Sequence, residues 1–173
     1  KRALIAAYEL LNLFYGMPFD GNNEAHFNKH REWIRIKLGD DHALHQLLSD
    51  DESWIRIISE CSNAIRHPED GQKIEIENFA LRPGNKFSPP AWRYDLTKKN
   101  LGKQDNYTDL IKDFDTNSHN MMTFFEEVLL LCMQDKLQDH KLLAIYKIPP
   151  EQVRVECPIL YKVSIKIPEP QVP

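Results

Sequence analysis

The chain has 173 residues, of which 42% are hydrophobic and 28% are charged, and its formal net charge is −4. This length is enough for one hydrophobic core and short for two ordinary domains, and the composition is far from that of disordered chains. Because the charge is negative, no global field attracts the protein to nucleic acid or anionic lipid, and a polyanion would need a local basic patch.

The apolar runs and the cysteines indicate in which cellular compartment the protein is expected. The longest apolar run, Val128 to Met133, is far below the roughly 20 residues of a membrane span, and the N-terminus lacks a signal-peptide pattern. Cys61, Cys132 and Cys157 are widely spaced and odd in number, and the first two lie in apolar helical patterns typical of free buried thiols. We therefore expect a cytoplasmic protein that makes no membrane contact.

Four helices are predicted in the N-terminal third from apolar residues that recur at helical spacing. Their predicted bounds are Ala3 to Tyr15, Glu24 to Leu38, Asp41 to Leu48, and Ser53 to His67. Asp51 or Ser53 is expected to cap the fourth helix, and Pro68 to end it.

After Gly71 the apolar residues recur every two positions instead of at helical spacing. Lys73 to Leu81 alternates, with Ile74 and Ile76 on one face, and Pro83 begins a turn. Ala91 to Leu96 is expected to return as the second strand of a hairpin over residues 72–96. The stretch 98–107 is predicted to be a polar loop.

Two further helices and a strand-rich tail complete the prediction. A short helix is expected from Tyr107 to Phe114, and a long one from His119 to Leu137 whose apolar residues cover most of its circumference, as in the interior of a bundle. The tail, 142–168, alternates between polar and β-branched residues and is expected to add edge strands to the hairpin. The prediction is one α+β domain spanning 1–173, mainly a helical bundle (1–67 and 106–140), with an inserted β-hairpin and C-terminal strands.

The fourth helix has two faces. Its apolar residues predict a buried stripe that packs against the long helix. These residues are Trp54, Ile57, Ile58, Cys61, Ala64 and Ile65. The opposite stripe consists of Arg56, Glu60, Asn63 and His67, which is typical either of a solvated face or of a site in which Asn63 orients a proton-transferring His67.

The run from Cys61 to Gly71, with Asn63 and His67 four residues apart, resembles the signature of the HEPN (higher eukaryote and prokaryote nucleotide-binding) family. The segment up to Trp92 is similar to the hairpin that follows this histidine in some uncharacterised bacterial relatives. The resemblance implies a helical bundle that acts as a homodimer, either as a metal-independent endoribonuclease of a toxin or defence system or, where activity is lost, as a regulatory module. It also implies His67 as the acid or base, with no cofactor.

Ser62 departs from the HEPN pattern, because the family has an arginine five residues before the histidine. A neutral hydroxyl cannot replace a bidentate guanidinium that stabilises charge on phosphorus. Arg56 lies about 16 Å along the helix from His67, so it could substitute only across a dimer, and Arg66 is a second candidate. The resemblance therefore predicts an enzyme that is weakened or inactive.

Residue type and spacing indicate other candidate sites. Six cations on and after the hairpin predict a modest RNA-binding patch, or only a solvated surface, with Trp92 and Tyr94 as stacking platforms. The cations are Arg82, Lys86, Arg93, Lys98, Lys99 and Lys103. The histidine pairs His26/His30 and His42/His45 lack the further ligands of a metal site, and none is expected. Nucleophile-elbow and phosphate-loop motifs are absent.

Two functions are consistent with the sequence. The first is a HEPN-like ribonuclease whose catalytic residues are His67, Asn63, and Arg56 or Arg66, with RNA as substrate and an antitoxin-like protein as partner. The alternative is a non-catalytic dimeric module that binds a protein through its dimer surface and exposed sheet edge.

Overall fold

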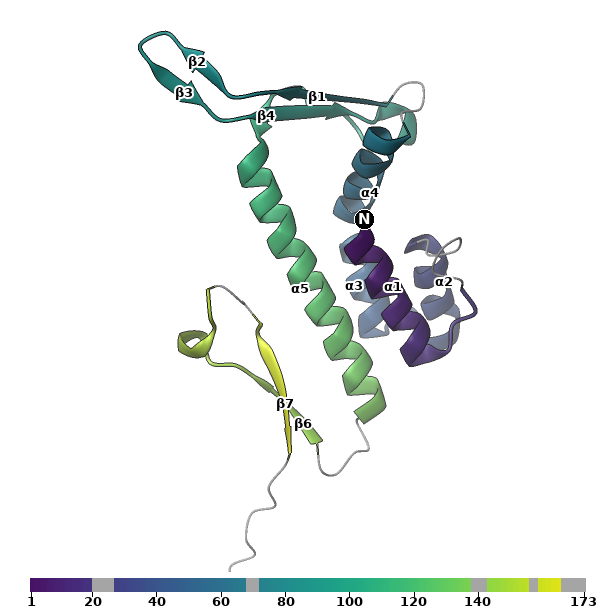
Figure 1. Cartoon of the computed structure of the whole chain (residues 1–173). Coiled ribbons are helices and arrows are strands. Elements are labelled where there is room, and N and C mark those ends of the chain that lie inside the picture. Colours follow the sequence, from purple (N-terminus) through teal and green to yellow (C-terminus); the bar gives the residue numbers. More distant parts are fainter. Residues whose placement is uncertain (20–26, 68–71, 138–142, 156–158, 166–173) are drawn as a thin grey trace, which may run out of the picture. The chain divides into compact units, whose positions relative to one another are not determined.

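A computed structural model of the chain describes all residues except 20–26, 68–71, 138–142, 156–158 and 166–173. The described part divides into two compact units, drawn with their elements in Figure 1. The ribbon unit contains residues 1–3 and 48–121, and the second unit contains residues 4–47 and 122–173. Helices and small antiparallel sheets both occur, so the α+β class is confirmed, whereas the single bundle remains a prediction.

The first four helices occur where periodicity predicts them. They are α1 (Arg2–Tyr15), α2 (Phe27–Leu38), α3 (Ala43–Asp50) and α4 (Glu52–Arg66). The predicted start of the second helix, at Glu24, lies outside the described residues. Asp51 occupies the N-cap of α4, and its carboxylate accepts a hydrogen bond from Trp54 Nε1 at 2.6 Å instead of capping the backbone.

The predicted hairpin forms the ribbon that gives the ribbon unit its name. β1 (Lys73–Glu77) pairs antiparallel with β4 (Ala91–Asp95), and β2 (Ala80–Arg82) pairs with β3 (Lys86–Ser88) farther out (Figure 1). The outer turn contains Gly84 and Asn85, both at positive φ, a conformation that glycine adopts freely and asparagine tolerates better than most residues. β5 (Thr108–Asp109) adds a short third strand beside β4.

The last two predicted helices are one continuous helix, α5 (Leu110–Leu137). The prediction that a short helix begins at Tyr107 was wrong, because strand β5 precedes the helix. The predicted break before His119 was also wrong, because no glycine or proline interrupts residues 110–137. The polar residues between them are compatible with an exposed helical surface. No helix among the described residues is both long and apolar enough to cross a membrane.

The predicted burial of α5 around its circumference was also wrong. Among its described side chains only Phe124, Val128 and Cys132 are buried, and their spacing of four residues forms one narrow stripe. The second unit also buries His30 completely, and this ring lies 3.0 Å from Asn12 Oδ1 and stacks on Tyr8. Fully buried aliphatic residues complete its core. They are Leu4, Leu11, Ile34 and Leu44.

The C-terminal strands do not extend the ribbon among the described residues. β6 (Leu143–Lys147) and β7 (Tyr161–Ile165) pair antiparallel with each other in a separate sheet. Between them the chain forms a 3-10 turn, Pro150–Gln152, because two successive prolines remove backbone donors that a strand would need. Glu126 Oε1 accepts hydrogen bonds from the backbone N–H groups of Leu160 and Tyr161. A side chain of α5 therefore satisfies the backbone donors at the start of β7.

Candidate functional site

The predicted catalytic histidine is at the C-terminus of α4. His67 is the C-cap residue, and its backbone N–H donates a 2.7 Å hydrogen bond to the carbonyl oxygen of Asn63. The His67 side chain is exposed, as is that of Arg66 beside it. The end of α4 therefore presents a cation and an imidazole to solvent.

Asn63 is engaged by residues other than His67. Its Oδ1 accepts a hydrogen bond from Lys1 Nζ at 2.6 Å, and its Nδ2 donates to Glu60 Oε1 at 3.4 Å. The other carboxylate oxygen of Glu60 accepts a 2.9 Å bond from Gln72 Nε2. The polar stripe of α4 thus binds the segments around it, and the predicted orientation of the imidazole by the amide is not among the described contacts.

The two candidate arginines occupy different places on α4. Arg56 donates a long 3.5 Å hydrogen bond to the carbonyl oxygen of Lys99 and lies 3.9 Å from Glu52 Oε1, so it is held near the first turn of the helix. Arg66 is at the last turn, beside His67. Within one chain, only Arg66 lies next to the histidine.

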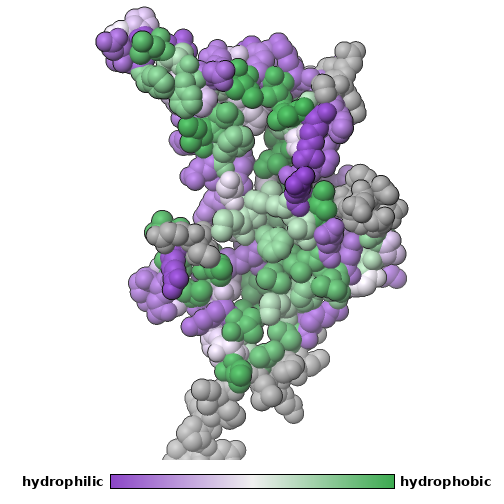
Figure 2. Space-filling model, in the orientation of Figure 1, coloured by the Kyte–Doolittle hydropathy of each residue, from purple (hydrophilic) through white to green (hydrophobic). Residues whose placement is uncertain are grey.

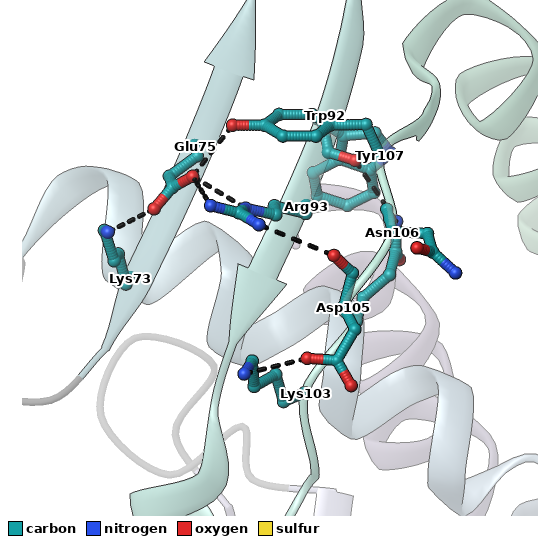
Figure 3. Close-up of polar contacts among 9 residues, drawn as sticks. Lys73, Glu75, Trp92, Arg93, Lys103, Asp105, Asn106 and Tyr107 are labelled. Atoms are coloured by element: carbon teal, nitrogen blue, oxygen red, sulfur yellow. Dashed lines mark hydrogen bonds and ion pairs between the residues drawn. The ribbon is translucent and has the colours of Figure 1, made fainter.

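Arg93, a predicted RNA contact, is held by a carboxylate across the ribbon. Glu75 is opposite Arg93 in the strand register, and Figure 3 shows its carboxylate at the centre of a polar network. Glu75 Oε2 accepts bonds from Arg93 Nε at 2.6 Å and from the Tyr107 hydroxyl at 2.8 Å, and Lys73 pairs with the other oxygen. The bonds from Lys73, Tyr107 and Arg93 lower the pKa of Glu75 to about 2, so the carboxylate stays ionised at neutral pH and neutralises the guanidinium.

Of the remaining predicted cations, Lys103 lies beside Arg93, with which it lines a small pocket. Arg82 pairs with Glu77 at 3.6 Å on the ribbon, and Lys103 pairs with Asp105 at 2.8 Å in the loop after it. Lys86 is exposed in β3. Lys98 and Lys99 are in a 3-10 turn, Thr97–Lys99, and both have partners.

The ribbon unit contains an apolar hollow of about 480 Å³ beneath the inner face of the ribbon. Its walls come from α4, from the β1–β4 pair and from the first turns of α5. Figure 2 shows hydrophobic side chains exposed over the ribbon in this part of the molecule. The apolar residues that line the hollow are Trp54, Ile57, Ile58, Cys61, Ile65, Ile74, Ile76, Trp92, Tyr94, Leu110 and Phe114.

This hollow corrects the predicted packing of α4. Of the stripe expected to be buried, only Cys61 and Ala64 are buried, whereas Ile65 is 66% exposed. Residues of the stripe line an open space that the ribbon and α5 leave unfilled. Periodicity predicted the buried Cys61 and Ala64, left out Ile55, which is only 1% exposed, and could not show that the covering of the stripe is incomplete.

Two of the polar side chains that line the hollow, Asp113 and Gln104, are hydrogen-bonded to neighbouring groups. Trp92 Nε1 donates to Asp113 Oδ2 at 2.7 Å, and the Thr108 hydroxyl donates to the same oxygen. Gln104 Nε2 donates to the Trp92 carbonyl oxygen at 3.2 Å and to Thr108 Oγ1 at 2.8 Å. Asp113, Gln104 and Tyr107 could not be predicted from the sequence, because no local pattern marks the contacts that they make with Trp92 and Glu75.

Cys61 is the thiol in this hollow. Burial, followed by the charge of Glu60, raises the pKa of Cys61 to about 11. Since the thiolate is the nucleophilic form, Cys61 stays protonated and unreactive at neutral pH. Burial likewise raises the pKa of Cys132 to about 12, and both thiols are free, as the sequence predicts.

Metal ligands are not assembled in the part of the chain that the structure describes. No three side chains of histidine, cysteine, aspartate or glutamate come together there in a geometry that could hold an ion. His30 is buried in the second unit, His42 Nε2 lies 3.2 Å from Asp135, and His45 bonds the Asp40 carbonyl oxygen. His26 lies outside the described residues.

Comparison of the chain with protein-family models, with curated proteins and with solved structures finds no match in any of the three. The class that the fold and site define is therefore stated from the geometry: an α+β protein with an apolar hollow beneath a protruding β-ribbon.

Proposed function

We propose that this protein is a non-catalytic interaction module, assembled as a dimer, whose apolar hollow receives a segment of another polypeptide chain. The observation that carries this proposal is the 480 Å³ hollow itself, whose walls include Ile65 and Phe114, both more than half exposed. Apolar surface gains roughly 25 cal/mol for each Å² removed from water. A polypeptide segment that fills the hollow would therefore be stabilised chiefly by burial.

Three side chains at the hollow support binding over chemistry. Asp113 and Gln104 are already hydrogen-bonded within the unit, and Cys61 is protonated. Catalysis by acid–base or nucleophilic groups requires a titratable side chain that can reach a substrate. An apolar peptide needs only shape and surface, which this hollow offers.

A photo-crosslinking experiment tests the proposal. p-Benzoylphenylalanine placed at Ile65, on the wall of the hollow, should form a crosslink to another polypeptide in living cells, identified by mass spectrometry. Filling the hollow with Ser62→Trp should lower the crosslink yield by about ten-fold or more, because the bulky ring occupies the space that the partner needs.

The control for this experiment is the same photoreactive residue at Leu13, which is 79% exposed but belongs to the second unit. A similar crosslink pattern from both positions would show nonspecific contact. If Ile65 forms no polypeptide crosslink, or if the yield is unchanged by Ser62→Trp in a protein with wild-type circular dichroism, the interaction function is wrong.

A second function, the metal-independent ribonuclease implied by the HEPN resemblance, is favoured by the exposed Arg66 and His67 at the end of α4. In this proposal the two side chains contact RNA, and a dimer brings two such ends together. Purified protein should then cleave RNA in EDTA, and His67→Ala should reduce the rate by about 100-fold or more. His119→Ala, at an exposed histidine on α5, is the matched control. Absence of cleavage on both structured and single-stranded RNA would remove this candidate.

A further inference from the structure

Strand β1 forms one edge of the three-stranded sheet, whose order is β1-β4-β5. On the far side of β4, the carbonyl oxygen of Tyr94 accepts a hydrogen bond from the Gln104 N–H, and that of Pro90 accepts one from the Leu110 N–H. In an antiparallel pair, residues whose backbone groups point toward the neighbouring strand alternate with residues whose groups point away. Because Tyr94 points away from β1 and is opposite Ile74, the N–H and C=O of Ile74 point to the outer edge of the sheet.

The same alternation leaves the backbone of Ile76 at this edge. The ladder to β4 uses the backbone groups of Lys73, Glu75 and Glu77, so each of the two isoleucines directs one donor and one acceptor outward. Among the described residues, these outward groups have no hydrogen-bond partner. Ile76 is also 55% exposed. Since the unpaired groups are backbone amides and carbonyls at strand spacing, the partner that fits them is a further extended strand.

A second copy of β1 fits this edge through its backbone. If two copies lie antiparallel with Glu75 on a two-fold axis, Ile74 of each copy is opposite Ile76 of the other. Two such pairs, each exchanging two hydrogen bonds, use every outward N–H and C=O of the four isoleucines. A shift of two residues in either direction places an isoleucine opposite Gln72 or Asn78 instead, so this register is the one in which all the unpaired groups meet.

The side chains of β1 match in the same register. On the face toward the hollow, both pairs between the copies join isoleucine to isoleucine, and β-branched pairs of this kind stabilise sheets. On the opposite face, Lys73 of each copy is opposite Glu77 of the other, an attractive pair. The two Glu75 carboxylates are adjacent on the axis, but each is already neutralised by Arg93 of its own chain. Backbone, apolar and charged groups therefore all favour the same partner.

We propose that two copies of the protein join their β1 edges antiparallel, so that two three-stranded sheets become one continuous six-stranded sheet. Both copies use the same patch about a two-fold axis, so the assembly closes as a dimer. Neither copy retains an open edge at β1. This inference rests on the dimer of the proposed function and names its interface, and it does not require the hollow to be filled.

Hydrogen exchange of single amides in the full chain tests the pairing directly. At concentrations at which the chain is monomeric, the Ile74 and Ile76 amides should exchange at the rate of unbonded groups, because they have no partner. At concentrations at which sedimentation equilibrium shows a dimer, their exchange should slow by about five-fold or more. The amides of Glu75 and Glu77, which bond β4 within one chain, are the control and should be protected at both concentrations.

Proline at position 76 tests the outward backbone bonds. Ile76→Pro removes the outward N–H and leaves the ladder to β4, which uses the neighbouring residues, and proline is tolerated at a sheet edge in this orientation. Ile76→Ala is the matched control, since it loses the same side chain and keeps the N–H. We expect the dissociation constant of the dimer, measured by sedimentation equilibrium, to be about ten-fold or more higher for Ile76→Pro than for Ile76→Ala.

A charge exchange tests the register without changing the backbone, so it remains decisive if Ile76→Pro disrupts the ribbon. Lys73→Glu should raise the dissociation constant by about three-fold or more, because it places like charges opposite each other at both ends of the strand pair. Adding Glu77→Lys should return the constant to within about two-fold of the wild-type value. Both variants lose the contact between Lys73 and Glu75 of one chain, so only a pair between the copies accounts for the recovery.

Several outcomes would overturn the edge pairing. A chain that stays monomeric at all concentrations contradicts it, as does a dimer in which the Ile74 and Ile76 amides remain unprotected. Protection that is independent of concentration would assign the edge to another segment of the same chain. Equal dissociation constants for Ile76→Pro and Ile76→Ala, or no recovery on adding Glu77→Lys to Lys73→Glu, would also refute the pairing.

Failure of the edge pairing is distinguishable from failure of the hollow. The polypeptide crosslink from Ile65 reports whether the hollow is filled, and it persists if only the edge pairing is wrong. Loss of that crosslink while the edge amides are still protected in the dimer would remove the function of the hollow and support the edge-paired dimer.

Discussion

Phe124→Ala is expected to lower the free energy of unfolding by about 3–5 kcal/mol, the cost of truncating a buried phenylalanine. Phe124 is only 1% exposed, and Val128 and Cys132 continue the same buried stripe of α5. Removing the ring loses the transfer free energy of its atoms and leaves a cavity, which the neighbouring helical turns cannot fill without bending. This loss is comparable to the total stability of many domains.

Urea denaturation followed by circular dichroism measures this effect, and Met122→Ala is the matched control. Met122 is two residues away on the same helix and 47% exposed, so its truncation is expected to cost about 1 kcal/mol or less. Equal losses from the two variants would contradict the narrow buried stripe and support burial around the circumference of α5.

The ribbon was predictable because its sequence alternates strictly. Ile74 and Ile76 face the hollow and Glu75 faces the polar network, as the two-residue period predicts. The register follows once the hairpin is assumed, and it places Glu75 opposite Arg93. The charge pair across the ribbon could therefore have been found from the sequence by pairing the two strands.

The continuity of α5 was less predictable because residues 115–120 are polar. Such a run is typical of a loop, yet a helix that exposes one surface tolerates it when glycine and proline are absent. The choice between loop and helix depends on whether both flanking turns pack in line, and that depends on distant parts of the chain. Local pattern does not contain this information.

The hollow could not be predicted from the sequence for a related reason. The apolar stripe of α4 shows which side chains avoid water, but their covering comes from the ribbon and α5, whose spacing is set by the whole unit. The same limit applies to Asn63, which helical spacing places near His67 but which Lys1 and Glu60 engage. Helical spacing gives the direction in which a side chain points, but it does not determine which residue that side chain contacts.

Trp92→Ala is expected to destabilise the ribbon unit by about 2–3 kcal/mol, less than for a fully buried tryptophan because Trp92 is half-buried. The indole is opposite Ile76 in the register, packs on Tyr94 with ring centroids 5.9 Å apart, and donates its N–H to Asp113. Its removal loses apolar burial on the ribbon and one hydrogen bond between the ribbon and α5.

Trp92→Phe separates these two contributions, because it keeps an apolar ring and loses the donor. We expect it to cost about 1 kcal/mol, the net value of one hydrogen bond, since the Thr108 hydroxyl still donates to Asp113. Hydrogen exchange at the amides of β1 and β4 measures both variants locally and should show faster exchange in Trp92→Ala than in Trp92→Phe. If Trp92→Ala exchanges like the wild type, the indole does not join the ribbon to α5, and the hollow beneath it lacks the rigid wall that docking requires.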